Sequence, residues 1–244
     1  MIFDSPPDNW KHLQKMVQQM FLEMNCHAEE GKRIDTVRGT FATDVYIVDS
    51  CKAPEMIYMI ECKYWGTRVP MSVIREFRTV VSDIGAHLGI IVSMEGFQEG
   101  AYRVAENTNI KLFSWDDFND YFLSRWLECM GINVESLTRK LIPFLDPDFS
   151  NLDFQKSESW DILRKWKALE LRSGGYLYFV NSHPKIGLED FPLQFIDNEV
   201  DLDKIKPEDY PSIFIHFETP RSYFNFMIEK VGSRLEDFKK LLGQ

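Results

Sequence analysis

Apolar residues recur every three to four positions near the start of the chain, a spacing typical of an amphipathic helix. Trp10, Leu13 and Val17 begin this series, which predicts a helix over residues 8–24. Asp8 can serve as its N-cap. Further helices are predicted over residues 71–84, 96–109 and 114–128.

The segments between these helices have the composition of strands. Residues 40–49 and 55–65 form two runs joined by residues 50–54, a loop with the length and the proline of a hairpin connection. Residues 88–92 and 109–113 are short apolar runs, and they are predicted as strands. Strands then alternate with helices, so we expect crossover connections and an α/β fold, a mixed sheet flanked by helices.

The pattern changes beyond residue 130, and a boundary is predicted between residues 128 and 132. Helices are expected over residues 133–145, 159–172 and 220–242, and strands over residues 175–180 and 212–217. Gly174 is a plausible end for the middle helix. The sequence therefore predicts two domains, residues 1–130 and a C-terminal α+β module of residues 131–244.

Composition is that of a folded protein, since hydrophobic residues make up 44% and aromatic residues 14%. No run approaches the roughly 18 apolar residues that span a bilayer. The N-terminus lacks the basic-then-apolar layout of a signal peptide, so a cytoplasmic protein without membrane contact is expected. The four cysteines have neither CxxC spacing nor the density of a secreted scaffold, which predicts reduced thiols.

The formal net charge of −10 argues against unspecific coating of nucleic acid. Any contact with DNA must use a local patch, for which the candidates are Arg38, Arg68, Arg75 and Arg78. The competing interpretation is that each is a solvated charge balanced by its neighbours. Residues 189–203 carry six acids and no base. They either dock a basic partner or the chain's own basic patch, or form a solvated loop.

Two charged residues stand at the end of an apolar run that is predicted to be a core strand. Glu61 and Lys63 stand two positions apart in the predicted strand, so both side chains project from the same face. If the hairpin folds between Lys52 and Ala53, antiparallel pairing puts Asp44 opposite Glu61, with Cβ atoms roughly 4.5–5.5 Å apart. A slip of one residue would turn Asp44 to the other face.

Two carboxylates and a lysine at one point suit phosphodiester hydrolysis. Mg²⁺ is usually held by one or two carboxylates, waters and substrate oxygens, and it activates a water. A lysine beside it can hold or deprotonate that water, or stabilise the charged phosphate. The simpler interpretation is a salt-bridged pair at a strand end, because charges there are costly unless paired or functional.

Residues 10–115 resemble the catalytic domain of Mrr-type restriction endonucleases, within the PD-(D/E)xK nuclease superfamily. The matching segments are TDVYIV, IECKYW, VIREFRTVVSDIGAHLGIIVS and GFQEGAYRVAENTNIKLFSW. The resemblance implies a restriction-endonuclease-like fold with Lys63 as the catalytic lysine. It also implies that Asp44, Glu61 and the Cys62 backbone carbonyl bind Mg²⁺, which Mn²⁺ can replace.

Some positions depart from the family pattern or leave alternatives open. Many Mrr-like domains have Gln where this chain has Glu61, and the retained carboxylate favours activity. Many have a glutamate near Gln14, which either orients a metal-bound water or is a surface amide. Gln98 and Ser93 either contact phosphate or serve packing. Trp65 either stacks on a base or braces the strand end, and bracing is the favoured interpretation.

These observations favour a Mg²⁺-dependent endonuclease that cleaves DNA in restriction or anti-phage defence. Residues 131–244 would then be a regulatory, dimerisation or recognition module, and cutting two strands favours a homodimer. One alternative is a nuclease fold recruited only for binding. Another is an effector subunit that a partner releases, such as a sensor or an ATPase, since the chain itself has no P-loop.

Overall fold

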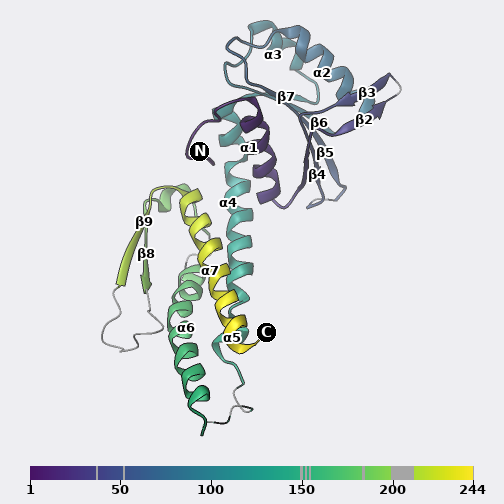
Figure 1. The fold of residues 1–244 in the computed structure, drawn as a ribbon. Helices are drawn as coiled ribbons and strands as arrows, with labels where there is room; N and C mark the ends of the chain where they lie inside the picture. The colour runs from purple at the N-terminus through teal and green to yellow at the C-terminus, as the bar shows by residue number, and fades with distance from the viewer. Residues whose placement is uncertain are drawn as a thin grey trace. The chain divides into compact units, whose positions relative to one another are not determined.

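The computed structural model describes residues 1–243 except residues 37, 52, 149–150, 152, 154, 183–184 and 199–211. Its contacts divide the chain into two compact units, Met1–Cys129 and Met130–Gln244 (Figure 1). The division falls within helix α4 (Trp115–Arg139), which begins in the first unit and ends in the second.

A mixed five-stranded sheet organises the first unit, in the order β1-β4-β5-β6-β7. Its strands are β1 (His27–Glu30), β4 (Val45–Asp49), β5 (Met56–Lys63), β6 (Leu88–Ser93) and β7 (Ile110–Ser114). Strands β1, β4 and β5 pair antiparallel, whereas β5, β6 and β7 pair parallel. The parallel connections run through α2 (Met71–Ile84) and α3 (Glu99–Ala105), so the predicted α/β class is confirmed.

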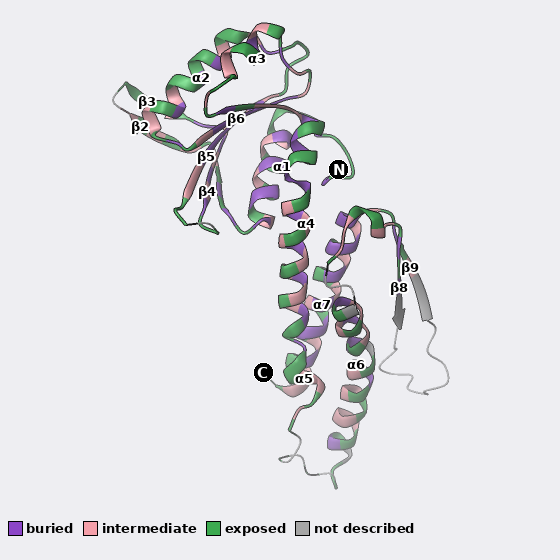
Figure 2. Cartoon of the chain, turned by 180° about the vertical axis from the view of Figure 1, so that it is seen from behind, coloured by how far each residue is buried: buried purple, intermediate pink, exposed green. Residues whose placement is uncertain are grey.

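Helices cover both faces of this sheet. On one face, Phe21 of α1 (Trp10–Glu23) contacts the rings of Tyr58 in β5 and of Phe118 and Phe122 in α4. Helices α2 and α3 cover the other face, and their outer sides are exposed (Figure 2). Successive strand residues point to opposite faces, so Tyr58 faces α1 while its neighbour Met59 faces α2.

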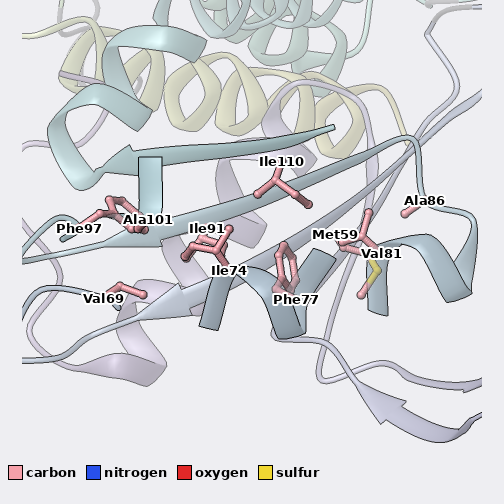
Figure 3. Packing of buried hydrophobic residues seen from close by; sticks show 10 residues of the cluster. All are labelled: Met59, Val69, Ile74, Phe77, Val81, Ala86, Ile91, Phe97, Ala101 and Ile110. Atoms are coloured by element: carbon pink, nitrogen blue, oxygen red, sulfur yellow. The ribbon is translucent and has the colours of Figure 1, made fainter. Parts of the chain in front are cut away.

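An apolar cluster fills the space between α2, α3 and the sheet (Figure 3). Its buried members are Met59, Val69, Ile74, Phe77, Val81, Ala86, Ile91, Phe97, Ala101 and Ile110. Gly89 of β6 lets α2 approach closely, because a Cβ there would lie 2.6 Å from Ile110 Cδ1 and 2.7 Å from Val81 Cγ2. This packing fixes α2 against the central strands.

The start of the first unit differs from the sequence prediction. The predicted strand over residues 40–49 is interrupted by Thr43 and Asp44, which separate β3 (Gly39–Ala42) from β4. β3 pairs with β2 (Arg33–Thr36) in a separate hairpin. Neither β1 nor β2 is predicted, because their sequences are largely polar; for β1 this composition suits a strand at the sheet edge.

The predicted N-cap of the first helix is also wrong. Asn9, not Asp8, caps α1, since its side-chain oxygen accepts a hydrogen bond from the backbone N–H of His12 at 3.0 Å. The Asp8 carboxylate instead lies 3.0 Å from Nδ1 of His12.

The second unit is helical with one small sheet. Besides the end of α4 it contains α5 (Ile142–Leu145), α6 (Ser157–Ser182), the 3-10 helix η1 (Leu188–Asp190), β8 (Leu193–Asn198), β9 (Ser212–Phe217) and α7 (Pro220–Leu242). β8 pairs antiparallel with β9, and Tyr176 of α6 stacks on Phe195 of β8 with ring centroids 5.4 Å apart.

Three predictions for this unit are wrong. The helix predicted over residues 133–145 is not one element, because α4 continues without a break to Arg139 and α5 covers only Ile142–Leu145. Residues 175–180 continue α6 rather than forming a strand, so Gly174 lies inside a helix and does not end one. Tyr176 and Val180, four positions apart, are both buried, which is the period of a helix face. β8 is not predicted, because acidic residues surround its buried Leu193 and Phe195.

The acidic segment 189–203 is only partly described. Glu189 and Asp190 belong to η1 and Asp197 to β8, whereas residues 199–203 lie outside the described residues. Among the helices that the structure describes, none combines the length and the apolar character needed to cross a membrane.

Candidate active site

The register of the β4–β5 hairpin is the one that the sequence predicts. Val45 pairs with Ile60 and Tyr46 with Met59. Continuing this register by one pair puts Asp44 opposite Glu61, at the point where the chain bends into β4. The structure therefore brings together two carboxylates that are distant in the sequence.

Asp44 is held by hydrogen bonds on both carboxylate oxygens. The Gln14 side-chain amide donates to Oδ1 at 2.6 Å, and the backbone N–H of Cys62 donates to Oδ2 at 2.7 Å. The Asp44 carbonyl accepts from the backbone N–H of Gly31 at 3.0 Å. Helix α1, strand β5 and the turn after β1 thus fix this residue together, and Gln14 is more than a surface amide.

Glu61 and Lys63 form an ion pair on the same face of β5, between Lys63 Nζ and Glu61 Oε1. Both side chains are largely buried, with exposed fractions of 17% and 16%. The Lys63 ammonium also lies 5.0 Å from the centroid of the Trp65 ring. The lysine is therefore fixed beside the two carboxylates.

Burial makes both carboxylates harder to ionise. It raises the pKa of Asp44, although the Cys62 N–H, the Lys63 charge and the Gln14 amide act in the opposite direction. It also raises the pKa of Glu61, to which the negative charge of Asp44 adds, against the contribution of Lys63. Two buried carboxylates that repel each other are a natural place for a cation.

The donor set fits an open magnesium site rather than a closed metal cage. Within the described part of the chain, no group of three or more His, Cys, Asp or Glu side chains is placed to hold an ion. Mg²⁺ commonly takes one or two carboxylates and keeps waters in its remaining positions. A carboxylate oxygen has two lone pairs, so each oxygen of Asp44 can accept its hydrogen bond and still face a cation.

Residues 8–122 match the family model of the Mrr catalytic domain, described as a restriction endonuclease. These residues belong to that family. The match confirms the resemblance seen in the sequence and indicates a nuclease of the restriction-endonuclease type. It contains every strand of the mixed sheet and the residues of the candidate site, and it ends within α4.

One solved structure is similar over 97% of this chain and 100% of its own length. It is a crystal structure of a protein of unknown function, AF1548, with 14% sequence identity and a TM-score of 0.41. A TM-score of this size does not establish a common fold. No curated protein is significantly similar to the chain.

Three of the four candidate arginines lie together in the Mrr-type domain. Arg38, Arg75 and Arg78 line one groove of about 340 Å³, between α2 and the β2–β3 hairpin. Thr79, Ser82 and Asp83 complete its lining, and Arg38 Nε lies 3.4 Å from Asp83 Oδ2. Arg68 is exposed in the loop between β5 and α2 instead.

The other two candidate residues of the Mrr-type domain, Gln98 and Ser93, lie in different surroundings. Gln98 is exposed at the start of α3, and its side chain makes no capping hydrogen bond. Ser93 is fully buried and donates to the carbonyl of Gly96 at 3.0 Å, which is a packing role. Tyr64, which sequence reasoning does not single out, donates to the Asp8 carbonyl at 3.0 Å and ties the N-terminal segment to the end of β5.

A second ionisable cluster lies at the other end of β4. Asp49 is fully buried and accepts from both terminal nitrogens of Arg125, at 2.6 and 2.9 Å, and from the Tyr58 hydroxyl at 3.0 Å. Burial opposes the ionisation of Asp49, but the hydrogen bonds and charge of Arg125 outweigh it and lower the pKa of Asp49. Both carboxylate oxygens of Asp49 therefore already accept hydrogen bonds from protein groups. We interpret this cluster as a structural link between α4 and the sheet rather than a substrate site.

Proposed function

We propose that the chain is a Mg²⁺-dependent endonuclease that hydrolyses DNA phosphodiester bonds, in restriction or anti-phage defence. The observation that carries the proposal is the convergence of Asp44, Glu61 and Lys63 at the end of one hairpin, in a domain of the Mrr family. Mn²⁺ is expected to replace Mg²⁺.

Each residue of the site has a distinct part in this mechanism. Asp44, Glu61 and the Cys62 backbone carbonyl would hold Mg²⁺. When bound, the ion supplies a water of lowered pKa and neutralises charge on the phosphate. Lys63 orients the attacking water and donates hydrogen bonds to the phosphate as its negative charge grows. Gln14 keeps the Asp44 carboxylate turned toward the site.

The arginine groove is the proposed contact for the DNA backbone. Along the chain, the elements that form its walls adjoin the candidate catalytic residues, since β3 ends shortly before Asp44 and α2 follows the loop after Lys63. Three guanidinium groups against the single carboxylate of Asp83 give the groove a positive balance despite the acidic chain. Guanidinium groups and hydroxyls are common partners of DNA phosphates.

The second unit is proposed to regulate, dimerise or direct the nuclease. A homodimer would supply two active sites for cutting two strands, and a sensor or an ATPase is the kind of partner that a defence nuclease would need.

Cleavage of several nucleic acids with Mg²⁺, Mn²⁺, Ca²⁺ or EDTA tests the function. Wild-type protein should cut DNA with Mg²⁺ or Mn²⁺, and Ca²⁺ should support binding without efficient turnover. Asp44→Ala, Glu61→Ala and Lys63→Ala should abolish cutting while circular dichroism stays unchanged. Lys111→Ala, at an exposed strand position, is the control. Full activity in EDTA, or in Lys63→Ala, would contradict the assignment.

A further inference from the structure

Trp65 follows the candidate catalytic lysine and is only partly covered. The residue is 40% exposed, while the Lys63 ammonium lies 5.0 Å from the centroid of its ring. A tryptophan whose only task was to brace the strand end would be expected to be buried. Lys63 is also fixed already by its ion pair with Glu61, so the ring is not needed to position the ammonium.

The loop around Trp65 has the character of a nucleic-acid contact. From residue 62 to residue 75 the chain carries Lys63, Arg68 and Arg75 but no acidic residue. This stretch contrasts with the net charge of −10 over the whole chain. Arg68 is exposed in the same loop, three positions after Trp65. An exposed ring next to cations is the combination that single-strand binding proteins use to stack bases and follow the backbone.

We propose that Trp65 is a stacking platform for the base next to the scissile phosphate. The preferred substrate is then DNA that is unpaired at the cleavage position, either a single strand or an unpaired stretch within a duplex. The proposal rests on the proposed nuclease function, because the scissile phosphate is placed by Lys63 and its two carboxylates. Arg68 follows the backbone on the far side of the stacked base.

The geometry favours unpaired DNA for a physical reason. In a duplex each base is stacked between its neighbours, so its face is hidden unless the nucleotide is turned out of the helix. Unpaired DNA presents such a face to the ring without the free-energy cost of turning a nucleotide out of the helix. Stacking on an aromatic side chain tolerates any base, so it selects for strand state rather than for sequence.

Cleavage kinetics on one labelled oligonucleotide, single-stranded or annealed to its complement, test the proposal. Wild-type protein should prefer the single strand, and Trp65→Ala should lower its kcat/KM on that strand roughly tenfold or more. Its kcat/KM on the duplex should change little, and Trp65→Phe should keep part of the preference. Tyr102→Ala, at another exposed aromatic residue, is the control. A wild-type preference for duplex, or an equal loss on both substrates, would overturn the stacking role.

Binding separates this inference from the nuclease proposal. With Ca²⁺ in place of Mg²⁺, a thymidine oligonucleotide should quench tryptophan fluorescence in the wild type and not in Trp65→Phe. Quenching that depends on Trp65, in a protein that never cuts DNA, would support the base-binding role and overturn the nuclease. Cleavage without this quenching would overturn the stacking role alone.

Discussion

Asp44 shows how a residue can be both tightly held and electrostatically unfavourable. Its two oxygens accept hydrogen bonds from Gln14 and Cys62, yet burial still raises its pKa. Glu61 lies beside it and repels it. Lys63 supplies one ammonium for two carboxylates, so the site carries one negative charge in excess. The proposed divalent cation would offset this excess.

The first prediction follows from the raised pKa of Glu61. A carboxyl whose pKa is raised by folding favours the folded state below its unfolded pKa, of about 4, and loses that contribution as pH rises through the folded pKa. Glu61→Gln should therefore be more stable than wild type in EDTA, increasingly so as pH rises, while cleavage is lost. Urea denaturation across this pH range measures it.

Magnesium should reverse this order, because it binds the wild-type folded state and not the unfolded chain. Added Mg²⁺ should raise the Tm of the wild type and leave that of Glu61→Gln nearly unchanged. Glu99→Gln, at an exposed ion pair with Arg103, serves as the control. Equal stability of wild type and Glu61→Gln in EDTA at every pH would contradict the electrostatic account.

Gln14 should act through Asp44 rather than on the substrate. Gln14→Leu removes the donor to Oδ1, and the Mg²⁺ concentration needed for half-maximal cleavage should rise about 10–100-fold. High Mg²⁺ should restore most of the rate, which a merely unfolded variant would not show. Gln18→Leu is the matched control, since Gln18 also lies on α1 but donates to the carbonyl of Ala28. An unchanged Mg²⁺ titration in Gln14→Leu would remove Gln14 from the site.

At the scale of elements, α4 is joined to β4 by the pair of Asp49 and Arg125. Arg125→Met leaves a fully buried carboxylate without its cation, which should reduce the free energy of unfolding by about 3–5 kcal/mol at neutral pH. The pKa of Asp49 is lowered, so the wild type keeps this contribution above the unfolded pKa of about 4 and loses it on further acidification. The difference between the two proteins should therefore shrink below about pH 4.

Chemical denaturation at several pH values measures that difference. The double variant Asp49→Asn with Arg125→Met should be more stable than Arg125→Met alone, because no unpaired charge remains. A loss below about 1 kcal/mol for Arg125→Met would show that Asp49 reaches water or another partner in solution.

Elements with a clear period were predictable from the sequence, and so was the pairing that brings Asp44 opposite Glu61. Helix 71–84 and the hairpin register follow from apolar spacing and loop length, and this register is what brings Asp44 to Glu61. Strand β1 escapes prediction because it is short and polar at a sheet edge. The strand prediction for residues 175–180 fails because aromatic residues suit a strand as well as a buried helix face. Contacts such as Tyr64 to Asp8 depend on tertiary placement that no local pattern encodes.

At the scale of the whole molecule, the net negative charge of the chain repels DNA and opposes the proposed binding. The net charge of −10 leaves the arginine groove as the proposed source of attraction, so affinity should fall steeply with salt. Arg75→Ala and Arg78→Ala should each weaken binding and reduce the slope of log K against log salt by about 1. Their ratio of single-strand to duplex cleavage should not change, unlike that of Trp65→Ala.

Filter binding across a salt series provides the measurement. Arg103→Ala, on the exposed surface of α3 beside Glu99, is the control. If the slope stays unchanged when Arg75 and Arg78 are both removed, the groove does not contact phosphates.

The continuity of α4 has a practical consequence for isolating the nuclease. A fragment that stops at Cys129 would end within the hydrogen-bonded helix, and the last carbonyls of the fragment would lose their N–H partners. Fraying from that new end would reach Trp126, whose indole N–H donates to Glu23 of α1, and then Arg125. A fragment that extends to Arg139 keeps the whole helix. A fragment meant to keep the nuclease domain intact should therefore extend beyond its family match.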